Sequence, residues 1–160
     1  ALSVRMPPRT GPLQPADLRY VERVVRTLAR RVGVVTVLPH WGTQYTHRPE
    51  PGQRLVAQRL AAAGADLVVG GHPHWVQGLD RSRGVVVAHS LGNFVFDMDF
   101  MTETMQGVLL ETTWWGDRLV QVSPVPYRLD AGFAPRPVTG PVARAILDDV
   151  WSTGRGPFSR

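Results

Sequence analysis

Histidines mark the places in this sequence where metal chemistry can occur. Four of the five histidines lie at or just beyond the ends of short apolar runs: His40, His72, His74 and His89. One residue separates His72 from His74, and in an extended backbone two such side chains point to the same side. Two imidazoles on one side suit a shared or bridged metal ion. Gly70 and Gly71 precede them and allow close backbone approach. The spacing alone leaves a metal site and a structural role both open.

The other polar candidates have simpler interpretations. His89 could reach the same site, but its place in an apolar run favours a buried structural histidine. His47 lies in a loop with nearby prolines, where we expect it to be exposed. Trp41 can stack on a ligand or cover the core. Asp97 and Asp99 are typical of solvated loop acids.

Two short apolar runs must place the histidines. Residues 34–38 and 66–69 are rich in apolar and β-branched side chains and predict buried strands. Between them, residues 53–63 predict a helix that ends at Gly64, a natural C-cap. A crossover helix of this length predicts that the two strands are parallel neighbours. Their carboxyl ends would then bring His40 and the later histidines to one edge of the sheet.

Two further helices flank this unit. Pro15 suits the first turn of a helix that ends at Gly33. Its apolar stripe consists of Leu18, Val21, Val25, Leu28 and Val32. Residues 141–151 show the same helical spacing near the end of the chain. The order of these elements predicts an α/β domain with a mixed sheet, formed by residues 1–160.

The second half of the chain is rich in predicted strands. Residues 85–89, 107–113 and 118–125 have the apolar, β-branched character of strands. A turn at residues 115–117 joins the last two as a hairpin. No helical period separates the three runs, so we expect this half to be antiparallel.

Composition excludes several classes of protein. With 43% hydrophobic and 19% charged residues, the chain does not resemble a disordered protein. It has no cysteine, hence no disulfide and no thiolate ligand. The apolar runs are shorter than the roughly 20 residues that span a bilayer. The net charge is +5, but all 18 basic residues are scattered arginines, which disfavours nucleic-acid binding. Ala1 in first place indicates a processed chain or a fragment.

Three motifs, taken together, resemble a known family. They are residues 39–42 (PHWG) with Tyr45, residues 63–74 (AGADLVVGGHPH) and residues 90–97 (SLGNFVFD). In this order they resemble the CapA family of bacterial capsule and poly-γ-glutamate synthesis proteins. That family in turn resembles calcineurin-like metallophosphoesterases. The resemblance extends over residues 15–115.

The resemblance implies a fold and a metal centre. The fold would be metallophosphoesterase-like, with mixed β-sheet layers flanked by helices (α/β/β/α), and this chain would form its C-terminal part. The centre would hold two divalent metal ions, of manganese, iron or zinc, with His40, His72 and His74 as ligands. His40 and Asn93 would be the residues closest to catalysis, Asn93 as a substrate or supporting residue.

The remaining ligands would come from an N-terminal half that residues 1–38 do not resemble. Gln44 stands where the family commonly has a glutamate, and Gly71 where a further histidine is common. We therefore expect residues 1–160 alone to bind metal weakly and to show no phosphoesterase turnover.

Two functions from different classes follow. The first is a metal-dependent hydrolase or transferase-type component of capsule assembly, acting on a capsule polymer or its precursor at the cell envelope. The alternative is a non-catalytic structural subunit of a capsule assembly or export complex. Metal content separates them, since the first predicts about two metal ions per chain of the full-length protein. Any membrane contact would be made through a segment outside this chain.

Overall fold

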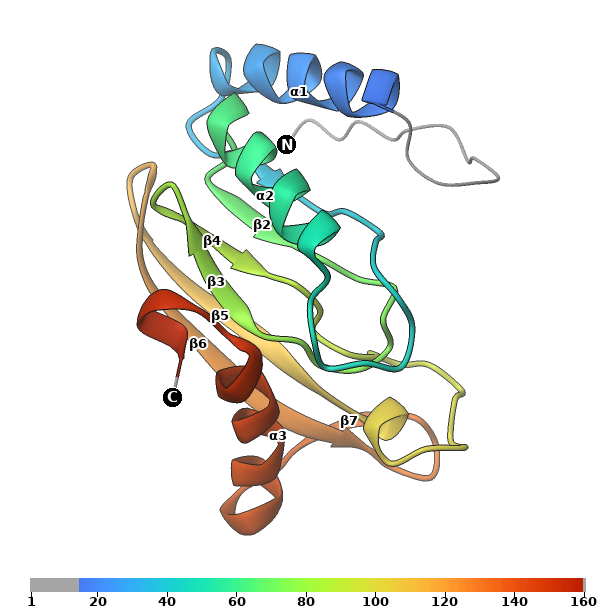
Figure 1. Cartoon of the computed structure of the whole chain (residues 1–160). Helices are drawn as coiled ribbons and strands as arrows, with labels where there is room; N and C mark the ends of the chain where they lie inside the picture. Colours follow the sequence, from blue (N-terminus) through green and yellow to red (C-terminus); the bar gives the residue numbers. More distant parts are fainter. Residues whose placement is uncertain (1–14, 160) are drawn as a thin grey trace.

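A four-stranded sheet positions the histidines in the computed structural model, which describes residues 15–159 (Figure 1). Its strands are β1 (Thr36–Val37), β2 (Leu67–Val69), β3 (Leu79–Ser82) and β4 (Val85–Ala88), in the spatial order β1-β2-β4-β3. β1 and β2 are parallel neighbours, as the crossover helix between them predicts.

The prediction for β4 is wrong in one respect. β4 does not join an antiparallel second half but pairs in parallel with β2. The reason is β3, a strand that the sequence analysis misses, which reverses the chain and pairs antiparallel with β4. The carboxyl ends of β1, β2 and β4 therefore share one edge, and the histidines follow them there.

Two helices pack together on one face of this sheet (Figure 1). α1 (Pro15–Ala29) ends somewhat earlier than predicted, and α2 (Pro51–Ala63) ends at Gly64 as predicted. Gly64 adopts the left-handed conformation, with φ of 103°, and caps the helix through its backbone N–H. The buried core between these helices and the sheet consists of Val25, Val35, Ala57, Leu60, Ala63, Ala65, Val68 and Val87.

A second, three-stranded sheet follows and is antiparallel, as predicted. Its strands are β5 (Gln106–Trp115), β6 (Arg118–Leu129) and β7 (Pro135–Pro137). The connection from β4 contains the short helix η1 (Glu103–Met105). The chain then forms α3 (Gly140–Thr153) and the short helix η2 (Gly156–Phe158).

α3 packs against β3, β5 and β6 and closes a second core. This core consists of Val76, Leu79, Ala88, Val108, Ile146 and Val150. The described residues thus form a mixed sheet and an antiparallel sheet flanked by helices, in agreement with the predicted fold class (Figure 1). Within residues 15–159, no helix has the length and apolar character needed to cross a membrane.

Candidate functional site

Parallel pairing brings the first two histidines together. Just beyond β1 and β2, His40 and Gly71 form an isolated parallel bridge. The Trp41 N–H donates to the Gly71 carbonyl and the Gly71 N–H donates to the Pro39 carbonyl, each at 3.0 Å. The ring centroids of His40 and His72 lie 4.5 Å apart as a result. The predicted meeting of these two residues at one edge is confirmed.

The His-x-His segment is not extended, and that prediction is wrong. His72 has φ of 102° and His74 φ of 63°, both in the left-handed region. Their ring centroids are nevertheless only 6.1 Å apart, so the turn gathers the rings by another route. We refer to His40, His72 and His74 as the histidine cluster.

His72 occupies the middle of the histidine cluster. Burial lowers the pKa of its imidazole, and the neighbouring His40 and His74 rings lower it further. Both effects favour the neutral ring. A neutral imidazole is the form that binds a metal ion, so His72 is in the state a ligand requires at neutral pH.

Asn93 orients the third ring. The His74 Nδ1–H donates to the Asn93 Oδ1 at 2.8 Å, which leaves His74 Nε2 as the nitrogen that can bind a metal. The Asn93 amide donates in turn to the Thr104 carbonyl at 3.0 Å. The hydroxyl of buried Tyr127 donates to the backbone carbonyl of Asn93. Burial raises the pKa of Tyr127 to about 12. Asn93 is thus held on three sides and fixes the tautomer of His74.

The outer side of His74 is bordered by side chains with little charge. Its Nε2 faces the amide of exposed Gln44 at the long distance of 3.5 Å. The Tyr45 ring stacks on His74, with 5.8 Å between centroids, and the Phe96 ring lies 5.6 Å away. Among the described residues, the weak contact from Gln44 is the one that a ligand arriving at His74 Nε2 would displace.

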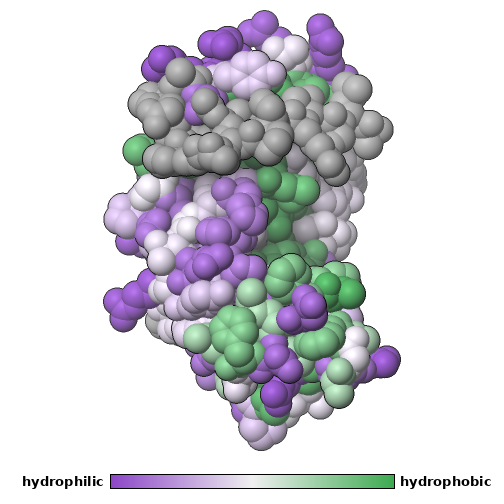
Figure 2. Space-filling model, turned by 90° about the vertical axis from the view of Figure 1, so that its right-hand side faces the viewer, coloured by the Kyte–Doolittle hydropathy of each residue, from purple (hydrophilic) through white to green (hydrophobic). Residues whose placement is uncertain are grey.

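An apolar loop lies beside the histidine cluster. Large exposed hydrophobic residues gather in the connection between β4 and η1: Phe94, Val95, Phe96, Phe100 and Met101. In Figure 1 this connection runs along the right-hand side of the molecule. Figure 2 views that side directly and shows hydrophobic side chains gathered in its lower half. Phe100 meets the edge of Tyr45, so this loop continues the aromatic border of the site.

The two remaining histidines have structural contacts. His89 is fully buried, as predicted, and its Nε2–H donates to the Asp80 carboxylate at 2.8 Å. His47 is not simply exposed: its Nδ1–H donates to the Val76 carbonyl at 2.7 Å and its ring contacts Trp75. The loop after His40 folds back over residues 75–76, and this covers His47.

One set of polar residues escaped sequence analysis. Arg54 of α2, Asp80 of β3 and His89 after β4 form a buried network in which both basic side chains pair with the same carboxylate oxygen. No spacing signal links them, because they come from three separate elements.

The fit of a metal ion to the histidine cluster can be judged from the ring spacing. Two imidazoles bound to one ion through nitrogens about 2.0 Å from it have centroids about 4.5 Å apart at right angles and about 5 Å apart at a tetrahedral angle. The His40–His72 pair matches the first value. Among the described residues, no group of three or more His, Cys, Asp or Glu side chains could hold a metal ion. The spacing of His40 and His72 alone would allow two ligands of one ion, and the described residues do not complete a coordination sphere.

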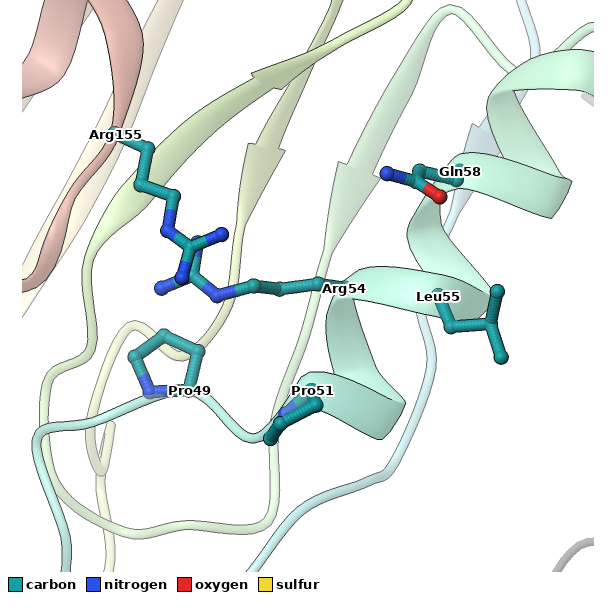
Figure 3. Close-up of a pocket in the computed structure, with 6 residues that line it drawn as sticks. All are labelled: Pro49, Pro51, Arg54, Leu55, Gln58 and Arg155. Carbon is teal, nitrogen blue, oxygen red and sulfur yellow. The ribbon is translucent and has the colours of Figure 1, made fainter.

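A pocket lies elsewhere, at the start of α2 (Figure 3). Its lining residues are Pro49, Pro51, Arg54, Leu55, Gln58 and Arg155. Figure 3 shows the Arg54 and Arg155 side chains reaching toward one another from opposite sides. Arg54 already donates to the Asp80 carboxylate and the Thr153 carbonyl. None of the histidines contributes to this pocket.

Comparison with known proteins agrees with these motifs. A model of the family described as bacterial capsule synthesis protein PGA_cap matches residues 3–98, a segment that contains His40, His72, His74 and Asn93. The chain is 37% identical over 106 residues to the capsule biosynthesis protein CapA of Bacillus anthracis, which covers 66% of this chain and 25% of that protein. It is 36% identical over 97 residues to the PGA biosynthesis protein CapA of Bacillus subtilis (strain 168), covering 61% of this chain and 25% of that protein. The matched segment thus spans about a quarter of the length of these relatives. The chain belongs to the bacterial capsule synthesis protein family PGA_cap.

Proposed function

We propose that this chain supplies part of a dinuclear divalent-metal site in a CapA-type protein of capsule or poly-γ-glutamate biosynthesis. The observation that carries the proposal is the 4.5 Å spacing of the His40 and His72 rings, which suits adjacent ligands of one ion. Two strands that are separate in sequence produce this spacing at the strand-end edge where α/β sheets bind ligands.

His74 suits a second ion beside the first. Its ring lies 6.1 Å from that of His72, farther than neighbouring ligands of a single tetrahedral ion would be. His40 and His72 would hold one ion of the pair, and His74 would hold the other. The hydrogen bond from His74 Nδ1 to Asn93 supports this role, since it points Nε2 away from Asn93 and toward a ligand position.

The remaining donors must come from outside the described residues. The relatives are about four times as long as the segment they share with this chain, which leaves ample room for carboxylate ligands. Hard divalent ions prefer such oxygen donors, and histidine alone does not choose among manganese, iron and zinc.

Divalent ions held by His40, His72 and His74 would supply Lewis-acid chemistry toward a phosphoryl or acyl oxygen. The residues of this chain would hold the ligand rings in the positions that this chemistry needs. His40 and His72 fix one position, and Asn93 holds the tautomer of His74. We place His40 nearest to the reacting atoms, and Asn93, which is buried and bonded to the opposite side of the His74 ring, as the residue that supports His74. The substrate would be the capsule polymer or its precursor at the cell envelope, in keeping with the names of the relatives.

A zinc titration tests the ligand assignment. Resonances of the histidine rings are followed by NMR in the chain as it stands, with manganese as a second, paramagnetic probe. We expect weak binding that broadens His40, His72 and His74 first. His72→Ala and His74→Ala should reduce binding strongly, while His47→Ala should not, because His47 contacts Val76 and not the cluster.

Two outcomes would contradict the proposal. Equal zinc binding in the three alanine variants would remove the ligand assignment. A tight isotherm for two ions per chain, or clear hydrolysis of a generic phosphodiester, would show that no donors from elsewhere are needed.

A further inference from the structure

The Arg54–Asp80–His89 network lies behind the histidine cluster. Asp80 faces Val87 across the β3–β4 pair, and His89 follows β4 directly. Asp80 Oδ2 accepts from His89 Nε2 at 2.8 Å and from the Arg54 guanidinium. Asp80 is 8% exposed and His89 is 0% exposed, so both polar groups have been removed from water.

We expect this network to make the fold less stable than an apolar core of the same volume would. Buried ions lose several kcal/mol of hydration each, and apolar residues of similar volume often give a more stable protein. Asp80 Oδ1 and His89 Nδ1 are buried without a hydrogen-bond partner among the described residues, which adds to the cost. Stability alone does not explain the network, and its contacts point toward a positioning role.

Trp41 connects the network to the site. Its indole N–H donates to the His89 carbonyl at 2.9 Å, and its ring stacks on the His89 imidazole with 5.7 Å between centroids. A Cβ at Gly70 would lie 2.2 Å from both the His89 carbonyl oxygen and the Trp41 indole nitrogen. The contact therefore exists only because residue 70 is a glycine.

Trp41 also immediately follows His40. Its backbone N–H is bonded to Gly71, the residue before His72. The indole is thus held by His89 while the backbone N–H is held by Gly71, just beyond β2, and His40 directly precedes this doubly held residue. A shift of the His89 ring would pass to His40 through a single residue.

We propose that Arg54, Asp80 and His89 are positioning residues that act through Trp41 to fix the His40 imidazole beside His72. The geometric part of this statement concerns the chain itself. Its consequence for metal affinity rests on the function proposed above.

Trp41→Phe is the most direct test. Phenylalanine keeps a ring against His89 but has no N–H to donate to the His89 carbonyl. In the metal-free chain, we expect the imidazole resonances of His40 to shift and broaden, while those of His47 and the circular dichroism spectrum stay unchanged. Trp115→Phe is the matched control, since Trp115 is 82% exposed at the β5–β6 turn.

Asp80→Asn tests the network from its other end. Loss of groups that orient a metal ligand typically lowers affinity about 10- to 100-fold, and we expect zinc binding at the histidine cluster to weaken in that range. Arg54→Lys should retain most of the affinity because it keeps the charge beside Asp80, whereas Arg54→Met should not. Asp130→Asn is the control, because Asp130 forms an exposed pair with Arg136.

The outcomes distinguish failure of the positioning role from failure of the metal site. Unchanged His40 resonances in Trp41→Phe would overturn the positioning role, whatever the zinc titration gives. Absence of zinc binding in the unsubstituted chain would overturn the metal site, and the His40 resonances would still decide the positioning role. If Asp80→Asn fails to fold, Trp41→Phe alone decides.

Discussion

The Arg54–Asp80 ion pair should respond unequally to the loss of each partner. Arg54→Met leaves a carboxylate that is 8% exposed and retains only His89. Asp80→Asn leaves a guanidinium that still donates to the Thr153 carbonyl at 3.3 Å and lines the pocket at the start of α2. The arginine that remains can be hydrated through that pocket, while the carboxylate that remains cannot.

The expected costs follow from this asymmetry. Removing one partner of a buried ion pair costs about 3–5 kcal/mol when the remaining charge is uncompensated, and we expect Arg54→Met to fall in this range. Asp80→Asn should cost about 1–3 kcal/mol, the value for buried polar groups that lose a partner. Urea-induced unfolding at pH 7 measures both free energies.

A pH series adds an independent check. Burial acts to raise the pKa of Asp80, but the hydrogen bond and charge of His89 and the Arg54 guanidinium outweigh it, so the pKa lies below its ordinary value of 3.8. A carboxylate with a lowered pKa stabilises the fold above its unfolded value and loses this contribution as the pH falls through the folded value. The stability difference between Asp80→Asn and the unsubstituted chain should be full at pH 7 and should shrink below about pH 3.8.

Equal costs for the two variants would refute the argument from hydration. A difference for Asp80→Asn that stays constant from pH 7 into acid would refute the argument from charge. Asp130→Asn serves as the control for the first comparison, since its ion pair with Arg136 is exposed and should contribute little.

Three further changes have expected outcomes of different sign. Tyr127→Phe should lower the free energy of unfolding by about 1–3 kcal/mol, because the buried Asn93 carbonyl loses its hydroxyl donor; urea unfolding measures it. Gly70→Ala should destabilise by about 1–3 kcal/mol or more, since its Cβ would lie 2.2 Å from the His89 oxygen, and a variant as stable as the original would show that the strand can move aside. Asp149→Asn should stabilise: burial raises the pKa of this carboxyl above its ordinary value of 3.8, so its charged form opposes folding as the pH rises. The gain should stay under about 1 kcal/mol at pH 7, because the side chain is 35% exposed, and it should vanish in thermal melts below about pH 3.8.

Elements with a strong apolar pattern could be predicted from the sequence. The stripe from Leu18 to Val32 and the cap at Gly64 gave two helices, and the β-branched runs gave β1, β2 and β4. β3 and β7 were missed for a physical reason. β3 (Leu79–Ser82) is mostly polar because its two charged residues serve a salt bridge and an exposed edge, and β7 (Pro135–Pro137) has two prolines in three residues.

The candidate site was predictable as a set of residues but not in its geometry. Strand ends located His40, His72 and His74, and parallel pairing explained why the first two meet. The left-handed conformation of His72 and His74 could not be predicted from the sequence, because neither residue is glycine, the residue that usually indicates it.

The network behind the site could not be foreseen at all. Arg54, Asp80 and His89 come from a helix and two strands, and only the folded chain brings them together. His89 alone suggested burial through its apolar neighbours. Its partner Asp80 lies in β3, a strand that the sequence did not indicate because it is mostly polar.

Four left-handed residues around the histidine cluster set a limit on how this protein can be stabilised. Tyr45, His72, His74 and Val95 have φ of 60°, 102°, 63° and 50°, and none of them is glycine. This conformation costs an ordinary side chain roughly 1–2 kcal/mol relative to its preferred region. A laboratory selection for heat resistance alone would therefore favour glycine or asparagine at these positions, and each gain at His72 or His74 would remove an imidazole. Thermostability and the integrity of the site are opposed at His72 and His74, so a library for improving the fold should leave these two residues unchanged.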